Sequence, residues 1–314
     1  MKPIKQTLVS GAMMLALSLV FTSCDDILGE WSRPAPNPVV PTPEPEPTAA
    51  KTYRVYTSGT AYTDEPIPPG AVAVESSAAV TWPAGTYVVS GDASIGGDIT
   101  LTGNVNLILC DGAKLTVNGR IVGGDKSLNI YGQTAGTGKL TMDGCGGDYN
   151  IYVKDLQIHG GDISGTNSDQ ALFTNGTLKI YHGNISATAG SYGLVANGNL
   201  SIYGGTITAS STAADAVFVK NASMEMTGGS LTATATASGT AGVKVDPDID
   251  IFGGTIIATG GPSGKGFIGT LTNKIGASLN IGRKANIGDA WTVEPVANDA
   301  AATQFDRYMI LPKP

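Results

Sequence analysis

Aromatic residues recur at one position of a short repeated motif. The motif is clearest in "LSIYGGTITA" (Leu200–Ala209), where the fourth residue is a tyrosine. Aromatic rings along a β surface can stack on the apolar faces of sugars, while polar neighbours bond the hydroxyls. The same rings can instead serve only to stabilise parallel strands by packing on one another. The candidate carbohydrate-binding residues are Tyr131, His159, Tyr181, Tyr203 and Phe252.

Three acidic residues form a second candidate site. The segment "DPDID" places Asp246, Asp248 and Asp250 close together in the chain. Calcium binds several oxygen ligands at once, and clustered carboxylates can supply them. A solvated acidic turn is the alternative interpretation, because the intervening Pro247 suits a turn. We therefore expect no cofactor, with calcium at these three aspartates as the one candidate metal.

Residues suited to catalysis are sparse. A polysaccharide lyase needs carboxylates that hold a metal and a nearby arginine or lysine base. Within residues 84–288 the only arginines are Arg120 and Arg283, which lie many repeats apart, although a lysine base stays open. A glycoside hydrolase needs paired carboxylates facing one groove. The sequence therefore favours a protein that is not an enzyme, with a lyase or a hydrolase as the alternative.

The motif returns at intervals near 22 residues, which is typical of a solenoid. Apolar and polar residues alternate in each copy, two glycines follow, and a further short apolar segment closes the unit. Three short strands per unit predict one turn of a parallel β-helix, whose stacked turns share a core. The clear copies begin at Leu156, Leu178, Leu200, Met224 and Ile249, with looser copies at Leu107, Leu128 and Leu279.

The predicted fold is an all-β, single-stranded parallel β-helix of about eight turns over residues 84–288. It is expected to be right-handed, because parallel crossovers almost always are. Stacked strands expose open edges at both ends, so residues 51–83 and 289–314 are predicted to be caps. With 43 glycines among 314 residues, 14% charged and 6% aromatic residues, the composition agrees with an all-β body.

The N-terminus has the pattern of a lipoprotein signal peptide. Residues 1–23 contain a basic start and an apolar run that is short for a membrane span, and "FTSC" resembles a bacterial lipobox ending at Cys24. An ordinary cleaved signal is the alternative. Asp25 and Asp26 resemble the surface-export signal of Bacteroidetes-type lipoproteins, although in enterobacteria such residues favour the inner membrane. Residues 24–50 then form a proline-rich stalk with seven prolines between Pro34 and Pro47.

Charge and cysteine content exclude several classes of partner. Without residues 1–23 the chain has 17 Lys and Arg against 26 Asp and Glu, a net charge of −9. Such a chain has no electrostatic attraction to nucleic acid or anionic lipid. The remaining cysteines, Cys110 and Cys145, are too few for a disulfide framework and are expected to be free, although they could pair across neighbouring turns.

One long segment resembles a known family. "TWPAGTYVVSGDASIGGDITLTGNVNLILCDGAKLTVNGRIVGG" (81–124) followed by "SLNIYGQTAGTGKLT" (127–141) resembles a β-helix module of surface lipoproteins from gut anaerobes. The resemblance covers about residues 81–260. That module is described as a carbohydrate-binding domain and is similar in shape to polysaccharide lyases, so the resemblance implies a carbohydrate ligand.

These observations predict a lipoprotein of the outer membrane, exposed at the cell surface, that binds a plant or host polysaccharide without cleaving it. The alternative is an adhesin or a structural surface rod without a glycan ligand, whose partners would be other surface proteins.

Overall fold

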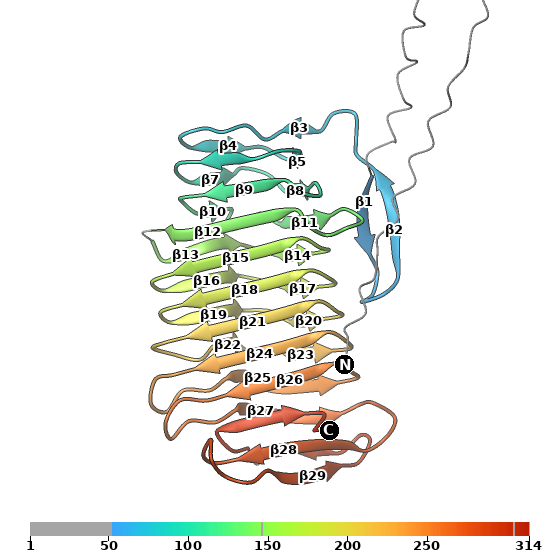
Figure 1. Ribbon diagram of the computed structural model, residues 1–314, viewed down its shortest axis with the longest axis vertical. Helices are drawn as coiled ribbons and strands as arrows, with labels where there is room; N and C mark the ends of the chain where they lie inside the picture. Colours follow the sequence, from blue (N-terminus) through green and yellow to red (C-terminus); the bar gives the residue numbers. More distant parts are fainter. Residues whose placement is uncertain (1–51, 146, 304, 314) are drawn as a thin grey trace, which may run out of the picture. The chain divides into compact units, whose positions relative to one another are not determined.

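The chain folds into stacked parallel strands. The computed structural model describes residues 52–145, 147–303 and 305–313, and these residues are all β with no helix. The strands form a β-solenoid of about nine turns with ~22 residues per turn (Figure 1). The predicted parallel β-helix is therefore confirmed, with one turn more than expected. None of the described residues belongs to a helix that could span a lipid bilayer.

Each turn contributes three strands that follow the repeated motif. In one central turn they are β17 (Leu178–Ile180), β18 (Asn184–Ala189) and β19 (Tyr192–Ala196). Every second residue of β18 is buried, as expected for strands with one face on a core. Leu156 pairs with Leu178, and Leu178 pairs with Leu200, so the motif stays in register from turn to turn.

Equivalent strands of successive turns form three columns. The first column holds β3 (Val72–Ala73), β5 (Gly85–Val89), β8 (Val105–Leu109), β11 (Leu128–Gly132), β14 (Leu156–Ile158), β17, β20 (Leu200–Ile202) and β23 (Met224–Met226). The second holds β6 (Ala93–Ile95), β9 (Lys114–Val117), β12 (Lys139–Cys145), β15 (Asp162–Asn167), β18, β21 (Thr206–Ser211), β24 (Ser230–Ala235) and β26 (Thr255–Thr259). The third holds β4 (Val80–Trp82), β7 (Ile99–Leu101), β10 (Ile121–Val122), β13 (Tyr149–Val153), β16 (Gln170–Thr174), β19 and β22 (Val217–Val219). The longer strands β25 (Val243–Ile251) and β27 (Phe267–Asn273) continue both the third and the first column.

The glycine pair of the motif makes the corner between the first and second columns. Gly183, Gly205 and Gly229 have φ angles of 109°, 84° and 79°, a region that favours glycine. A Cβ at Gly205 would also lie 2.7 Å from the carbonyl oxygen of Gly183 in the turn before. The corner thus requires glycine for its backbone angle and for the close approach of turns.

The interior is one apolar core that runs through all the turns. Leu156, Leu178 and Leu200 stack in the first column, and each is at most 1% exposed. Burial of one such side chain stabilises the fold by roughly 1.5–3 kcal/mol, so the repeated apolar positions hold the turns together.

Two of the looser motif copies were predicted wrongly, one in its starting residue and one in the direction of its partner strands. Val105, not Leu107, pairs with Leu128, so that turn begins two residues earlier. Leu279 does not begin a parallel turn, because β28 (Leu279–Lys284) pairs antiparallel with β29 (Thr292–Val296) and β31 (Tyr308–Leu311). A short apolar alternation fits a buried strand of either direction, so the motif alone could not show this difference.

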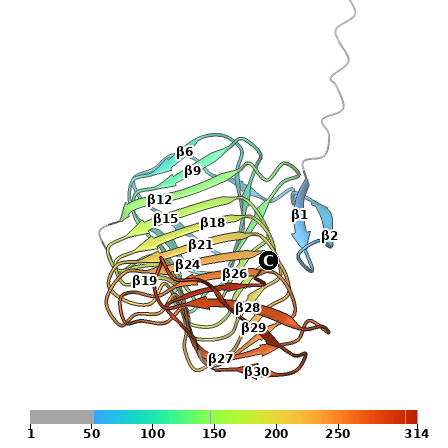
Figure 2. The same cartoon turned by 60° about the horizontal axis from the view of Figure 1, so that its bottom comes forward.

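The two ends of the stack are built differently. At the C-terminal end β31 pairs antiparallel with β26, and β30 (Ala301–Ala302) pairs antiparallel with β27, so these strands cover the last edges. At the other end β3 and β4 already belong to parallel columns. The hairpin of β1 (Thr52–Tyr56) and β2 (Tyr62–Pro66) instead lies along the flank of the stack, beside β11 (Figures 1 and 2).

Candidate functional site

Four of the five predicted aromatic residues form one continuous stack. The ring centroids of Tyr131 and His159 are 4.7 Å apart, those of His159 and Tyr181 4.5 Å, and those of Tyr181 and Tyr203 4.7 Å. The interplanar angles are only 8–14°. We call these four residues the ladder. Their ring faces contact one another, so, apart from the free face of Tyr203 at the end of the ladder, only the ring edges point outward.

The β1–β2 hairpin covers most of the ladder. Tyr53 packs edge-on against Tyr131 with centroids 4.9 Å apart, and Tyr56 stacks on His182 at 4.7 Å. The backbone N–H of Tyr56 donates to Nδ1 of His159 at 3.1 Å, and His159 is only 4% exposed. The ladder is therefore first of all the surface on which the hairpin docks.

The ladder is held in its uncharged form. Burial lowers the pKa of His159 to about 4 and raises the pKa of Tyr131 to about 12. The N–H donated by Tyr56 also requires an unprotonated Nδ1 on His159, so the hairpin contact and the neutral imidazole belong together. Near neutral pH, stacking is thus free of any buried charge.

The fifth predicted residue, Phe252, is separated from the ladder. Thr227 occupies the column position between Tyr203 and Phe252, and Phe252 is 45% exposed. A cavity of about 480 Å³ opens beside this break. The hairpin tip forms one wall with Ser58 and Thr60, and Tyr203 and Thr227 contribute to the opposite side.

A second group of aromatic rings lies on the outer face of the third column. Tyr152 pairs in register with Phe173, and two positions further along the same column Phe218 follows across Val195. Tyr149 lies 4.9 Å from Tyr152, and Tyr192 lies 5.6 Å from Phe218, between ring centroids. Each of these rings is partly exposed. We call the group the third-column patch: Tyr149, Tyr152, Phe173, Tyr192 and Phe218.

Polar groups accompany the third-column patch. Lys244 lies 5.0 Å from the ring centroid of Phe218 and 3.7 Å from the carboxylate of Asp215. Burial raises the pKa of Tyr192, and the nearby carboxylates of Asp215 and Asp169 raise it further. Rings flanked by carboxylates and an ammonium group offer both apolar contact and hydrogen-bonding groups at one surface.

The aromatic residues of the third-column patch are visible in the sequence, but they lie at unequal distances from the repeated motif. Tyr152 lies four residues before the next motif copy, Phe173 five residues before, and Phe218 six residues before. The turn between the third strand and the next first strand therefore differs in length. The aromatic residues of the third strands therefore do not share one position when residues are counted from the start of each motif.

The candidate calcium ligands do not gather around one point. Asp246, Asp248 and Asp250 lie at alternate positions along β25, where such residues are spaced by roughly 6.6 Å along the strand. Within residues 52–145, 147–303 and 305–313, no group of three or more His, Cys, Asp or Glu side chains could hold a metal ion. A calcium site at these aspartates is therefore left without geometric support.

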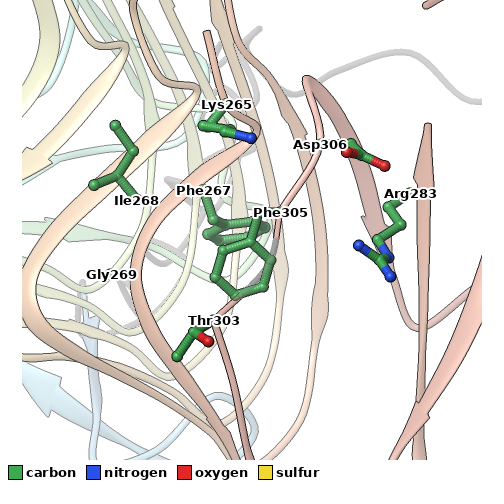
Figure 3. Close-up of a pocket in the computed structure, with 8 residues that line it drawn as sticks. All are labelled: Lys265, Phe267, Ile268, Gly269, Arg283, Thr303, Phe305 and Asp306. Carbon is green, nitrogen blue, oxygen red and sulfur yellow. The ribbon is translucent and has the colours of Figure 1, made fainter. Parts of the chain in front are cut away.

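A charged cavity lies near the C-terminal end of the stack. It measures about 480 Å³, and Figure 3 shows Phe267 and Phe305 against each other at its centre, with Arg283 and Asp306 opposite Ile268. Arg283 is engaged with Glu294 at 3.0 Å, and both phenyl rings are buried. This cavity therefore presents no open ring face to a sugar.

Several predictions concern parts of the chain outside the described residues. The signal peptide (1–23), the lipidated Cys24 and the stalk (24–50) belong to this group. Cys110 is buried in the core, and the side chain of Cys145 also lies outside the described residues.

Comparisons of the chain with protein-family models, with curated proteins and with solved structures gave no match.

Proposed function

We propose that the protein binds polysaccharide without cleaving it, and that the third-column patch is the binding face. The observation that carries this proposal is the set of five partly exposed rings on neighbouring turns. The pyranose ring has apolar faces that stack on aromatic side chains, so a row of rings suits an extended sugar chain.

The polar surroundings of the patch supply the second half of sugar recognition. Sugar hydroxyls both donate and accept hydrogen bonds, and carboxylates accept while lysine donates. Asp169, Asp215 and Lys244 lie beside the rings and offer these groups. Several weak contacts repeated along the stack favour a polymer over a single sugar.

The proposal is tested by retention of the purified protein on insoluble and soluble plant and host polysaccharides, with calcium and with a chelator. We expect retention that does not depend on calcium and yields neither new reducing ends nor unsaturated products. The double variant Tyr152→Ala, Phe218→Ala should bind roughly 5- to 150-fold more weakly, since each stacked ring contributes roughly 0.5–1.5 kcal/mol.

The matched control is Trp291→Ala, because Trp291 is an aromatic residue that is 37% exposed and lies outside the patch. Equal binding by the patch variant and the control would reject the patch as the binding face. Formation of reducing ends or unsaturated products would mean that the protein is an enzyme that cleaves polysaccharide. Absence of binding to every glycan would favour an adhesin or a structural surface protein.

We further propose that Cys24 carries a lipid anchor and holds the protein at the outer membrane, facing the cell surface. The support is the lipobox-like "FTSC" and the acidic residues that follow it. Metabolic labelling with a fatty acid should modify the wild-type chain and leave Cys24→Ala unlabelled.

A further inference from the structure

The aromatic ladder is interrupted by one missing ring. Tyr203, Thr227 and Phe252 occupy equivalent backbone positions, because each N–H donates at 2.8 Å to a carbonyl of the preceding turn, at the residue just before its equivalent there. The acceptors are Ile180, Ile202 and Met226. A threonine thus stands where the surrounding turns place an aromatic residue.

The gap has the thickness of one ring. Neighbouring rings of the ladder are 4.5–4.7 Å apart, which matches the spacing of the turns. Tyr203 and Phe252 are two turns apart, so their positions are separated by roughly 9.6 Å. One face of Tyr203 is stacked on Tyr181, and its other face points toward the gap. The space above Thr227 can therefore take one further ring.

A cavity surrounds this gap and provides hydrogen-bonding groups. Its volume is about 480 Å³. Ser58 and Thr60 line it from the hairpin tip, and His182 and Thr227 line it from the stack. The hairpin tip approaches the stack closely, because a Cβ on Gly59 would lie 2.0 Å from the carbonyl oxygen of Tyr203. Hairpin and ladder together thus shape the cavity.

The lining of the cavity is uncharged. It contains no Asp, Glu, Lys or Arg side chain. Burial lowers the pKa of His182, and the nearby Arg54 lowers it further, so His182 is neutral at neutral pH. An acidic sugar would lose hydration here without gaining a cation, whereas a neutral sugar would find hydroxyl and imidazole partners.

We propose that this gap binds one neutral pyranose residue against the free face of the Tyr203 ring, in the space above Thr227. The inference rests on the proposed function and adds a second site to it. A sugar stacked parallel to the ring of Tyr203 lies across the direction in which the turns stack, and the hairpin tip closes one side of the cavity. The sugar residue in the gap is accordingly the end of a chain or of a side branch. The third-column patch, in contrast, suits the internal residues of an extended chain.

The test is titration of the purified protein with methyl β-D-glucopyranoside, methyl β-D-galactopyranoside and methyl α-D-mannopyranoside, followed by ligand-observed NMR. Methyl β-D-glucuronide is the charged comparison. At least one neutral glycoside should bind with a millimolar Kd, and the glucuronide should bind at least tenfold more weakly. Thr227→Tyr fills the gap with the residue type of the ladder and should weaken binding at least tenfold.

Thr227→Ser is the matched control and should bind within about twofold of the wild type, because it retains the gap. Tyr203→Ala removes the ring against which the sugar stacks and should also weaken binding at least tenfold, so the test does not depend on the folding of one variant. Unchanged binding in both Thr227→Tyr and Tyr203→Ala, or no binding of any neutral glycoside, would overturn the inference.

Binding at the third-column patch and binding in the gap can be rejected independently of each other. The third-column variant Tyr152→Ala, Phe218→Ala should leave binding of the methyl glycosides unchanged. Polysaccharide retention with no glycoside binding rejects the gap and keeps the proposed function. Glycoside binding that Thr227→Tyr abolishes, without any polysaccharide retention, keeps the gap and rejects the third-column patch.

Discussion

His159 is the most deeply buried residue of the ladder, and its contacts connect the hairpin to the stack. Its ring lies between those of Tyr131 and Tyr181, and its Nδ1 accepts the backbone N–H of Tyr56. Protonation would remove this hydrogen bond and place a charge among aromatic rings. The structure therefore couples the docking of the hairpin to the neutral state of one imidazole.

Stability should fall on acidification because of His159. Its pKa is about 4 in the folded protein, below the ordinary value of about 6.5, so only the unfolded chain takes up this proton between these pH values. The contribution of neutral His159 to the free energy of unfolding is complete above pH 6.5 and is lost as the pH falls toward 4. At pH 4.5 the loss amounts to roughly 2.5 kcal/mol.

Denaturant unfolding at pH 7.5 and pH 4.5 measures this effect. His159→Tyr keeps a ladder ring and should lose roughly 2.5 kcal/mol less than the wild type between the two pH values. His182→Gln is the comparison variant. Burial also lowers the pKa of His182, but His182 is more exposed than His159, so this variant should retain more of the wild-type pH dependence than His159→Tyr. The same pH dependence in the wild type and in His159→Tyr would contradict the assignment.

At the scale of elements, the hairpin is held by one strand only. All residues of β2 are exposed, whereas β1 is partly buried against the ladder. Gln133 donates to the carbonyl oxygen of Thr52 at 2.7 Å, and Tyr56 and Tyr53 supply the ring contacts. The hairpin therefore behaves as a separate element whose docking can be weakened without loss of the solenoid.

Tyr56→Ala should release the hairpin. The variant loses a buried ring and its stacking on His182, which weakens docking by roughly 2–3 kcal/mol. Hydrogen–deuterium exchange should then increase in residues 52–66 and stay low in the core strands. The pKa of His159 should rise toward its ordinary value in an NMR titration.

Tyr62→Ala is the control for this prediction. Tyr62 is 43% exposed on β2, so its removal should change docking by less than about 1 kcal/mol. Equal exchange rates in Tyr56→Ala and Tyr62→Ala would show that the ring of Tyr56 does not hold the hairpin.

At the scale of the whole molecule, stability is shared between neighbouring turns. Leu200 lies in a central turn and packs between Leu178 and Met224, whereas Leu101 lies near the N-terminal end of the stack. In a solenoid each turn contacts only its neighbours, so terminal turns open more easily than central ones.

Leu200→Ala should therefore lower the free energy of unfolding by roughly 2–5 kcal/mol. Leu101→Ala should cost less in global unfolding and should mainly accelerate exchange in residues 80–101. Denaturant unfolding combined with hydrogen–deuterium exchange distinguishes these outcomes. An equal global loss in both variants would mean that the stack unfolds as one unit without fraying.

The sequence predicted the solenoid because its determinants are local and repeated. Alternation in segments such as Leu178–Ile180 defines a buried strand, and the glycine before each second strand defines a corner. The aromatic column could be predicted for the same reason, because Tyr181 and Tyr203 occupy the fourth position of consecutive motif copies. Leu279 was misassigned because an isolated apolar alternation does not encode the direction of its partner strand.

Other features depend on contacts between residues far apart in the chain. Tyr56 and His159 are separated by 103 positions, and no motif near either residue predicts their hydrogen bond. The third-column patch required the actual strand register, because turns of unequal length shift Tyr152, Phe173 and Phe218 relative to the motif.

By itself, then, the sequence determined the repeat, the three strands of each turn and the column of rings, because side-chain alternation and glycine corners act within one turn. Only the tertiary structure decided that the hairpin covers Tyr131 to Tyr203 and that the rings around Phe173 form a surface. It also showed that the break at Thr227 is a cavity. Exposure depends on which distant segments pack together, and the local pattern of residues does not contain that information.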